Sequence, residues 1–132
     1  MNATRPMVLI LDDEERIREL LIDYLGDYDE FDLVGAGSAE EALGLLARQP
    51  VDLCMVDIRL PGMDGAAFIL AARESGLCPR FIVHTGSVGL ALTEEMRGVG
   101  LTRDDVFLKP ADIDKILERI RERLRTPVHG ED

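Results

Sequence analysis

The most constraining feature of this sequence is a short apolar run, Leu53 to Val56, which ends at an aspartate, Asp57. An unbroken apolar run of this length is typical of a strand that is covered on both faces. The chain then reads LPGMDG from residue 60 to residue 65, where a proline and two glycines favour a sharp reversal. Asp57 is therefore expected at the rigid edge of a buried strand, facing a crevice.

Four further apolar segments of strand length alternate with amphipathic helical patterns along the chain. The strands are predicted at 7–11, 31–36, 53–56, 80–85 and 106–108. A helix is predicted after each strand, with 66–75 as the third, 90–97 as the fourth and a fifth beginning at Ile113. This alternation predicts parallel strands joined by right-handed crossovers in a doubly wound α/β fold. In such folds the ligand lies outside the carboxyl ends of the strands.

Length and charge limit the classes of protein that fit. A chain of 132 residues suits one domain, expected at 7–125, with an N-terminal extension at 1–6 and a tail at 126–132. The net charge of -11 argues against direct binding to nucleic acid, which needs a basic face. The apolar run at 7–11 is too short for a signal peptide, so a cytoplasmic protein without a membrane segment is expected.

Polar residues end four of the five predicted strands. Asp12 and Asp13 follow the first strand, Asp57 the third, Thr85 the fourth and Lys109 the fifth. Two unit charges 4 Å apart repel by roughly 4 kcal/mol at an effective dielectric near 20, so three converging carboxylates need a cation. Mg²⁺ suits such oxygen ligands, and the expected absence of histidine or cysteine at this edge argues against zinc.

The same residues suggest a reaction. Carboxylates, a divalent metal, an ammonium and a hydroxyl together are what a transferring phosphoryl group needs, with Asp57 as the nucleophile. Each residue also has a purely structural reading, because Asp12 or Asp13 could cap a helix and Lys109 could be solvated. Their joint placement at the ends of four strands favours a functional site.

With these residues placed, the chain resembles the receiver domain of two-component response regulators. The resemblance runs from Met7 to about Arg125 and rests on four motifs: DDE from Asp12, DIRLPGMDG from Asp57, Thr85-Gly86 and Lys109-Pro110. It implies a flavodoxin-like sheet with strand order 2-1-3-4-5 and five helices.

The resemblance also implies roles for individual residues. A phosphoryl group would pass to Asp57 from a phosphohistidine, in a signalling domain that is not an enzyme in the ordinary sense. The implied ligands of Mg²⁺ are Asp13, Asp57 and the backbone carbonyl of Arg59, with Asp12 acting through water. The implied phosphate contacts are Lys109, Thr85 and the amide of Gly86, and the Lys109-Pro110 peptide is expected to be cis.

The implied partners are a sensor histidine kinase or a histidine phosphotransfer protein, and a downstream protein. The downstream protein would bind the face made by the fourth helix, fifth strand and fifth helix, and the chain would be a monomer or a phosphorylation-dependent dimer. Here the sequence departs from the family, because Val106 stands where an aromatic residue is usual and Phe107 follows it, while Ala111 replaces a common phenylalanine. Phe107 cannot simply substitute, since successive strand residues point to opposite faces.

Three other functions are compatible with parts of the pattern. A flavodoxin-like cofactor binder would share the fold, but its phosphate loop would not read Asp-Asp-Glu-Glu. An aspartyl-phosphate hydrolase would carry a second aspartate at position 59, which is Arg59 here. A receiver-like docking module that is not phosphorylated would not need the complete acidic set.

Overall fold

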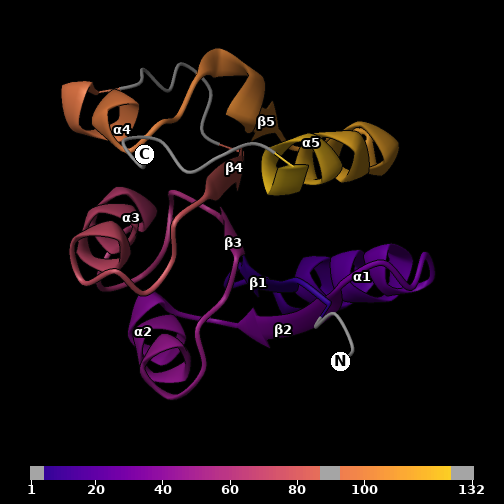
Figure 1. Ribbon diagram of the computed structural model, residues 1–132, viewed down its shortest axis with the longest axis horizontal. Helices are drawn as coiled ribbons and strands as arrows, with labels where there is room; N and C mark the ends of the chain where they lie inside the picture. The colour runs from indigo at the N-terminus through magenta and orange to yellow at the C-terminus, as the bar shows by residue number, and fades with distance from the viewer. Residues whose placement is uncertain (1–4, 87–92, 126–132) are drawn as a thin grey trace.

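The computed structural model describes residues 5–86 and 93–125, which form a parallel sheet between two layers of helices (Figure 1). The strands are β1 (Met7–Leu11), β2 (Asp32–Ala36), β3 (Leu53–Val56), β4 (Phe81–Thr85) and β5 (Val106–Leu108). The helices are α1 (Glu15–Gly26), α2 (Ala39–Arg48), α3 (Gly65–Glu74), α4 (Glu94–Gly98) and α5 (Ile113–Arg125), with a 3₁₀ turn, η1, at Arg103–Asp105.

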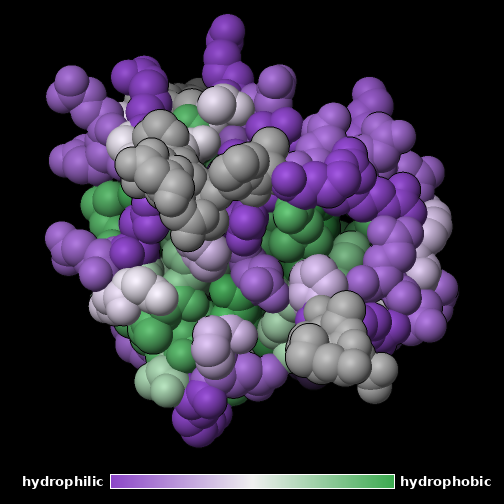
Figure 2. Space-filling view, viewed as in Figure 1, coloured by the Kyte–Doolittle hydropathy of each residue, from purple (hydrophilic) through white to green (hydrophobic). Residues whose placement is uncertain are grey.

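The sheet has the strand order β2-β1-β3-β4-β5, and every neighbouring pair is parallel. This confirms the doubly wound α/β fold. In Figure 1, α2, α3 and α4 cover one face of the sheet and α1 and α5 cover the other. Figure 2 shows hydrophilic residues over much of both helical layers, with hydrophobic residues visible between them.

Alternating side chains of the central strands build two separate cores. Cys54 and Val56 of β3 pack on the side that holds Phe68 of α3. Leu53 and Met55 pack on the side that holds Ile116 of α5. All four β3 residues are buried because both faces of the strand are covered, which explains its unbroken apolar sequence. The next residue, Asp57, is where the strand leaves the sheet.

Helix four differs from the sequence prediction of 90–97. The described helix, α4, covers Glu94–Gly98, and residues 87–92 lie outside the described part of the chain. Thr93 caps it, since its hydroxyl accepts a hydrogen bond from the Met96 amide at 3.1 Å. Gly100, at φ 97°, then turns the chain after the helix.

The turn η1 was not predicted from the sequence. Its Asp105 is fully buried, and its carboxylate accepts a hydrogen bond from the Thr102 amide at 2.9 Å and from Arg119 Nε of α5 at 2.8 Å. Arg123 Nε lies 3.6 Å from the same carboxylate. Arg119 and Arg123 of α5 therefore hold the turn before β5.

No helix within residues 5–86 and 93–125 combines the length and the hydropathy needed to cross a membrane.

Candidate functional site

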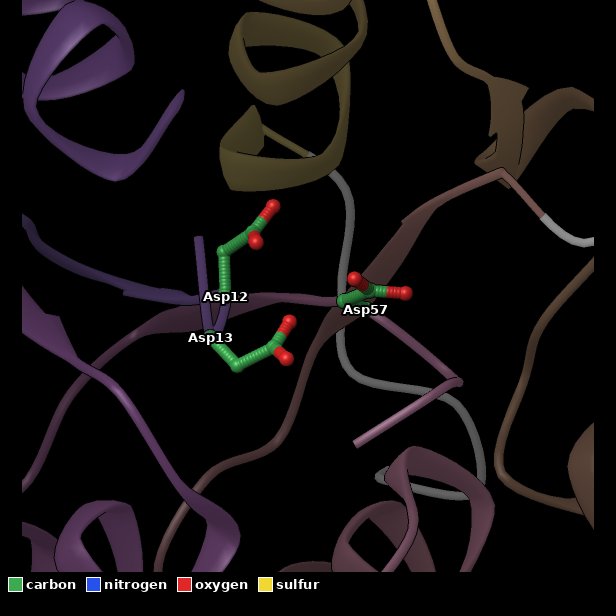
Figure 3. Close-up of side chains that lie close together, drawn as sticks. All are labelled: Asp12, Asp13 and Asp57. Atoms are coloured by element: carbon green, nitrogen blue, oxygen red, sulfur yellow. The ribbon is translucent and has the colours of Figure 1, made fainter. Parts of the chain in front are cut away.

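Three carboxylates meet where β1 and β3 end. Asp12, Asp13 and Asp57 place one oxygen each within 4.8 Å of one another (Figure 3). Backbone hydrogen bonds fix this meeting point, because the Asp12 amide donates to the Ala36 carbonyl at 3.1 Å and the Asp57 amide to the Leu11 carbonyl at 3.0 Å. Asp12 and Asp57 are buried, at 2% and 5% exposure, while Asp13 is exposed.

Lys109 forms ion pairs with this cluster. Its Nζ lies 2.8 Å from Asp12 Oδ2, 3.0 Å from Asp57 Oδ2 and 3.3 Å from Glu14 Oε1. The residue is placed by β5, since its amide donates to the Thr85 carbonyl at 2.9 Å. The peptide between Lys109 and Pro110 is cis, as the resemblance implies. Sequence reasoning placed Lys109 in the site but did not identify Glu14 as its third partner.

Burial and the ion pairs together shift the pKa values of Lys109 and Asp12. Burial alone lowers the pKa of Lys109, but its hydrogen bonds to Asp12 and Asp57 outweigh that effect and the net shift is upward. Burial raises the pKa of Asp12, and the hydrogen bond from Lys109 offsets part of that rise. Lys109 is therefore a fixed positive charge at neutral pH.

The loop after β3 forms a hydrogen bond with the Asp57 side chain. Asp57 Oδ1 accepts a hydrogen bond from the Arg59 amide at 3.1 Å, and the Gly65 amide donates to the Ile58 carbonyl at 2.9 Å. The Arg59 side chain is exposed. At the start of α3, Asp64 accepts a hydrogen bond from the Ala67 amide at 2.9 Å, so the helix begins at Gly65, one residue earlier than predicted.

The two other predicted phosphate contacts lie at the end of β4. Thr85 ends β4 and is fully buried, and its partner in the parallel register is Leu108 of β5. Gly86 follows it and is exposed. The structure thus brings Asp12, Asp13, Asp57 and Lys109 into one cluster and places Thr85 beside the strand that carries Lys109.

A histidine that sequence reasoning overlooked lies beside this site. His84 precedes Thr85 and is 6% exposed, although no histidine was expected at this edge. It lines a hollow of about 340 Å³ between α1 and the start of α5; the other lining residues are Glu14, Ile17, Leu20, Leu21, Lys109, Pro110, Ala111 and Ile113. Burial, with a smaller contribution from Lys109, lowers the pKa of His84 to about 4. Its imidazole is therefore neutral at pH 7.

This shift predicts a pH-dependent stability. Folding lowers the pKa of His84 from 6.5 to about 4, so the unfolded chain binds its proton more tightly. The contribution of His84 is complete above pH 6.5 and is lost as the pH falls toward 4. Between these limits the parent protein should lose on the order of 2 kcal/mol more unfolding free energy than His84→Leu. Urea denaturation near each limit measures the difference, and parallel losses would contradict the prediction.

The donor set of the acidic cluster fits Mg²⁺. The cluster offers only carboxylate oxygens from Asp12, Asp13 and Asp57, and one of these residues is open to solvent. Mg²⁺ is a hard cation that binds through a few carboxylates and keeps several waters. His84 is not a member of this cluster, so the cluster offers no nitrogen ligand and still favours Mg²⁺ over zinc.

Comparison with known proteins points to one family. The model of the response regulator receiver domain matches residues 8–121. The transcriptional regulatory protein AruR of Pseudomonas aeruginosa is 37% identical over 98% of this chain, and a probable chemotaxis protein CheY of Rhizobium etli is 32% identical over 86%. The chain spans 53% of AruR and 88% of the CheY protein. It spans only 27% of the response regulator protein PilR of Pseudomonas aeruginosa, to which it is 35% identical.

The fold agrees with this relationship. A response regulator receiver protein from Pseudomonas putida superimposes with a TM-score of 0.79 at 34% identity, covering 92% of this chain and 99% of that one. The family match covers most of the described residues, and the motifs that carried the resemblance lie within it. The chain therefore belongs to the response regulator receiver domain family.

Proposed function

We propose that this chain accepts a phosphoryl group from a phosphohistidine onto Asp57 and that Mg²⁺ supports the reaction. The observation that carries the proposal is the cluster in which Lys109 Nζ lies 3.0 Å from Asp57 while Asp12 and Asp13 stand beside it. It combines a buried nucleophile, a fixed cation and a set of oxygen ligands. These are the requirements of phosphoryl transfer, where positioning and charge stabilisation supply most of the catalysis.

The transfer is a displacement at phosphorus. A carboxylate oxygen of Asp57 forms the new O–P bond, the N–P bond of the phosphohistidine breaks, and its electron pair remains on the imidazole nitrogen. Asp13, Asp57 and the backbone carbonyl of Arg59 would hold Mg²⁺, with Asp12 acting through water. When bound, the ion neutralises charge on the phosphoryl oxygens.

The chain's own residues then stabilise the product. Lys109 exchanges its contact with Asp57 for one with a phosphoryl oxygen, which its 3.0 Å distance makes possible with little movement. The hydroxyl of Thr85 and the amide of Gly86 donate hydrogen bonds to the attached phosphate. We assign all of these roles to a receiver domain at 7–125.

The test uses acetyl phosphate as a small phosphodonor. Incubation with Mg²⁺ should add the mass of one phosphoryl group to the intact protein, and a chelator should prevent it. Peptide mapping should place the group on Asp57. Modification at another residue, or equal modification with the chelator present, would refute the proposal.

The two neighbouring aspartates should differ in their effect on metal binding. Asp13 is exposed and free to bind the ion directly, whereas Asp12 is 2% exposed and engaged with Lys109 and the Glu14 amide. Substituting an outer partner of a metal ligand typically costs at least about ten-fold in affinity, so Asp13→Ala should cost more than that. Asp12→Ala should cost less than Asp13→Ala. Calorimetric titration with Mg²⁺ compares the two, and the reverse order would exchange their roles.

We further propose that the phosphoryl donor is a sensor histidine kinase or a histidine phosphotransfer protein. The downstream partner would be a protein that binds the face made by α4, β5 and α5. Val106 packs on the α2, α3 and α4 side of the sheet, and Phe107 packs on the α1 and α5 side. Phe107 therefore faces away from the space beside Thr85, and Val106 is stiff at χ1. We propose that the signal leaves through the connection from Gly86 to Gly100, of which 87–92 lie outside the described residues.

NMR of the free protein and its beryllofluoride complex tests this route. Amide shifts should change strongly at Thr85 and over α4, while Val106 keeps one rotamer. The glycines of the connection lower the cost of rearranging its backbone. A rotamer change at Val106 or Phe107 with unchanged α4 amides would show that the strand carries the signal instead.

A further inference from the structure

A side chain from α1 reaches back to the acidic cluster. Arg18 lies in the first turn of the helix and is half-buried. Its Nη1 donates a hydrogen bond of 2.8 Å to the backbone carbonyl of Asp12. Among the described residues Arg18 forms no ion pair with a carboxylate, so this charge-assisted bond to a neutral carbonyl is its polar contact.

That carbonyl belongs to the peptide that joins Asp12 to Asp13. The Asp12 amide donates to the Ala36 carbonyl at 3.1 Å, and Asp12 Oδ1 accepts from the Glu14 amide at 2.9 Å. These two contacts hold Asp12 on either side of its α-carbon. The bond from Arg18 adds a third constraint, because it fixes the plane of the peptide between Asp12 and Asp13. The orientation of that peptide sets the direction in which the Asp13 side chain points.

Two glycines leave room for this side chain. A Cβ on Gly35 of β2 would lie 3.0 Å from Arg18 Cδ and 3.2 Å from its Cγ. A Cβ on Gly37 would lie 3.2 Å from Arg18 Nη1. The aliphatic stem of Arg18 thus lies along the backbone of β2, and its guanidinium is confined at the end. A confined side chain loses little additional entropy when it makes its hydrogen bond, so it can hold the peptide firmly.

We infer that Arg18 is a positioning residue for the metal-binding carboxylates, and that it acts on Asp13 through the carbonyl of Asp12. This inference rests on the proposed function for the identity of the metal. Arg18 does not touch the ion or the phosphoryl group; it sets the direction of a ligand that is itself exposed. Without it, the Asp12 to Asp13 peptide can rotate and Asp13 must be ordered when the ion binds.

Because Arg18 is positively charged, the direction of the change in Mg²⁺ affinity on its substitution tests the inference. A positive charge near the cluster repels Mg²⁺, so removing it strengthens metal binding if electrostatics alone operate. Removing the positioning bond weakens metal binding. Arg18→Met keeps an unbranched stem along β2 and removes both the charge and the donor, so the direction of the change shows which effect is larger.

The matched control is Arg16→Met. Arg16 is exposed, lies two residues away on the same helix and forms no hydrogen bond or ion pair within the described residues. The Arg16→Met substitution changes the net charge by the same amount but removes no contact with Asp12 or Asp13. Titration calorimetry with MgCl₂ on the full chain gives the affinity of each variant, and urea denaturation of the metal-free proteins gives their stability.

Arg18→Met should weaken Mg²⁺ binding roughly ten-fold, which is the lower end of the range for groups that orient metal ligands. Arg16→Met should leave the affinity unchanged or raise it slightly. In the metal-free protein, Arg18→Met should also shift the Asp13 amide resonance, which Arg16→Met should not. A residue that only stabilised the fold would lower the urea midpoint and leave the affinity of the folded protein unchanged.

Unchanged or tighter binding in Arg18→Met would overturn the inference while leaving the proposed function intact. A parent protein that binds no Mg²⁺ would instead contradict the proposed function itself. The parent titration therefore separates the two failures.

Discussion

Asp57→Asn is expected to remove phosphoryl acceptance completely. The amide has nearly the same volume as the carboxylate, so the buried position remains filled. It has no anionic oxygen to attack phosphorus, and it withdraws one negative charge from the metal site. No mass gain should appear after incubation with acetyl phosphate and Mg²⁺.

The same substitution should not unfold the protein. Three carboxylates place oxygens within 4.8 Å of one another, so neutralising one relieves repulsion. The melting temperature is expected to stay the same or rise. Asp23→Asn, at an exposed position of α1, is the matched control and should keep the full mass gain. Phosphorylation of Asp57→Asn at the parental rate would place the acceptor elsewhere.

Gly65→Ala is expected to cause the largest loss of stability. A Cβ at this position would lie 2.3 Å from the Asp57 carbonyl oxygen and 2.7 Å from Ile58 Cα. Both contacts are with backbone, so no side chain can turn away, and α3 must move relative to the end of β3. Overpacking of this kind costs about 3 kcal/mol or more. Because the displaced carbonyl belongs to Asp57, phosphoryl acceptance should also slow.

Gly44→Ala supplies the opposite case. Gly44 lies within α2 and is exposed, and a Cβ there would meet nothing within 4 Å. Alanine at a helix interior should stabilise the protein by about 0.5–1 kcal/mol. Urea denaturation compares both variants with the parent. Equal midpoints for Gly65→Ala and the parent would mean that the helix start has room that the structure does not suggest.

The strands were predictable because their burial is visible in the sequence. A strand covered on both faces has to be apolar throughout, and the bounds of the fully buried β3 match the prediction at both ends. The meeting of Asp12, Asp13, Asp57 and Lys109 also followed from topology, since parallel strands bring their carboxyl ends to one edge. The gathering of these four side chains could thus be inferred before the geometry of the site was known.

Contacts between distant segments were not predictable in the same way. Glu14 reaches Lys109 across 95 positions of sequence, and Asp105 is buried against Arg119 of another element. Nothing local distinguishes these charged residues from solvated ones. Helix four was predicted longer than α4, whose flanking glycines blur any periodic signal.

The place of Lys109 directly after the last strand has a consequence for how the protein is made. β1 and β3 carry the three carboxylates and leave the ribosome first, whereas the lysine that balances them arrives only with β5. Until then, pairing β1 with β3 brings like charges together without a protein cation, which opposes stable docking of the early strands. We therefore expect the fold and the proposed phosphoryl-acceptor site to be completed together, and a nascent chain that stops short of β5 to lack both.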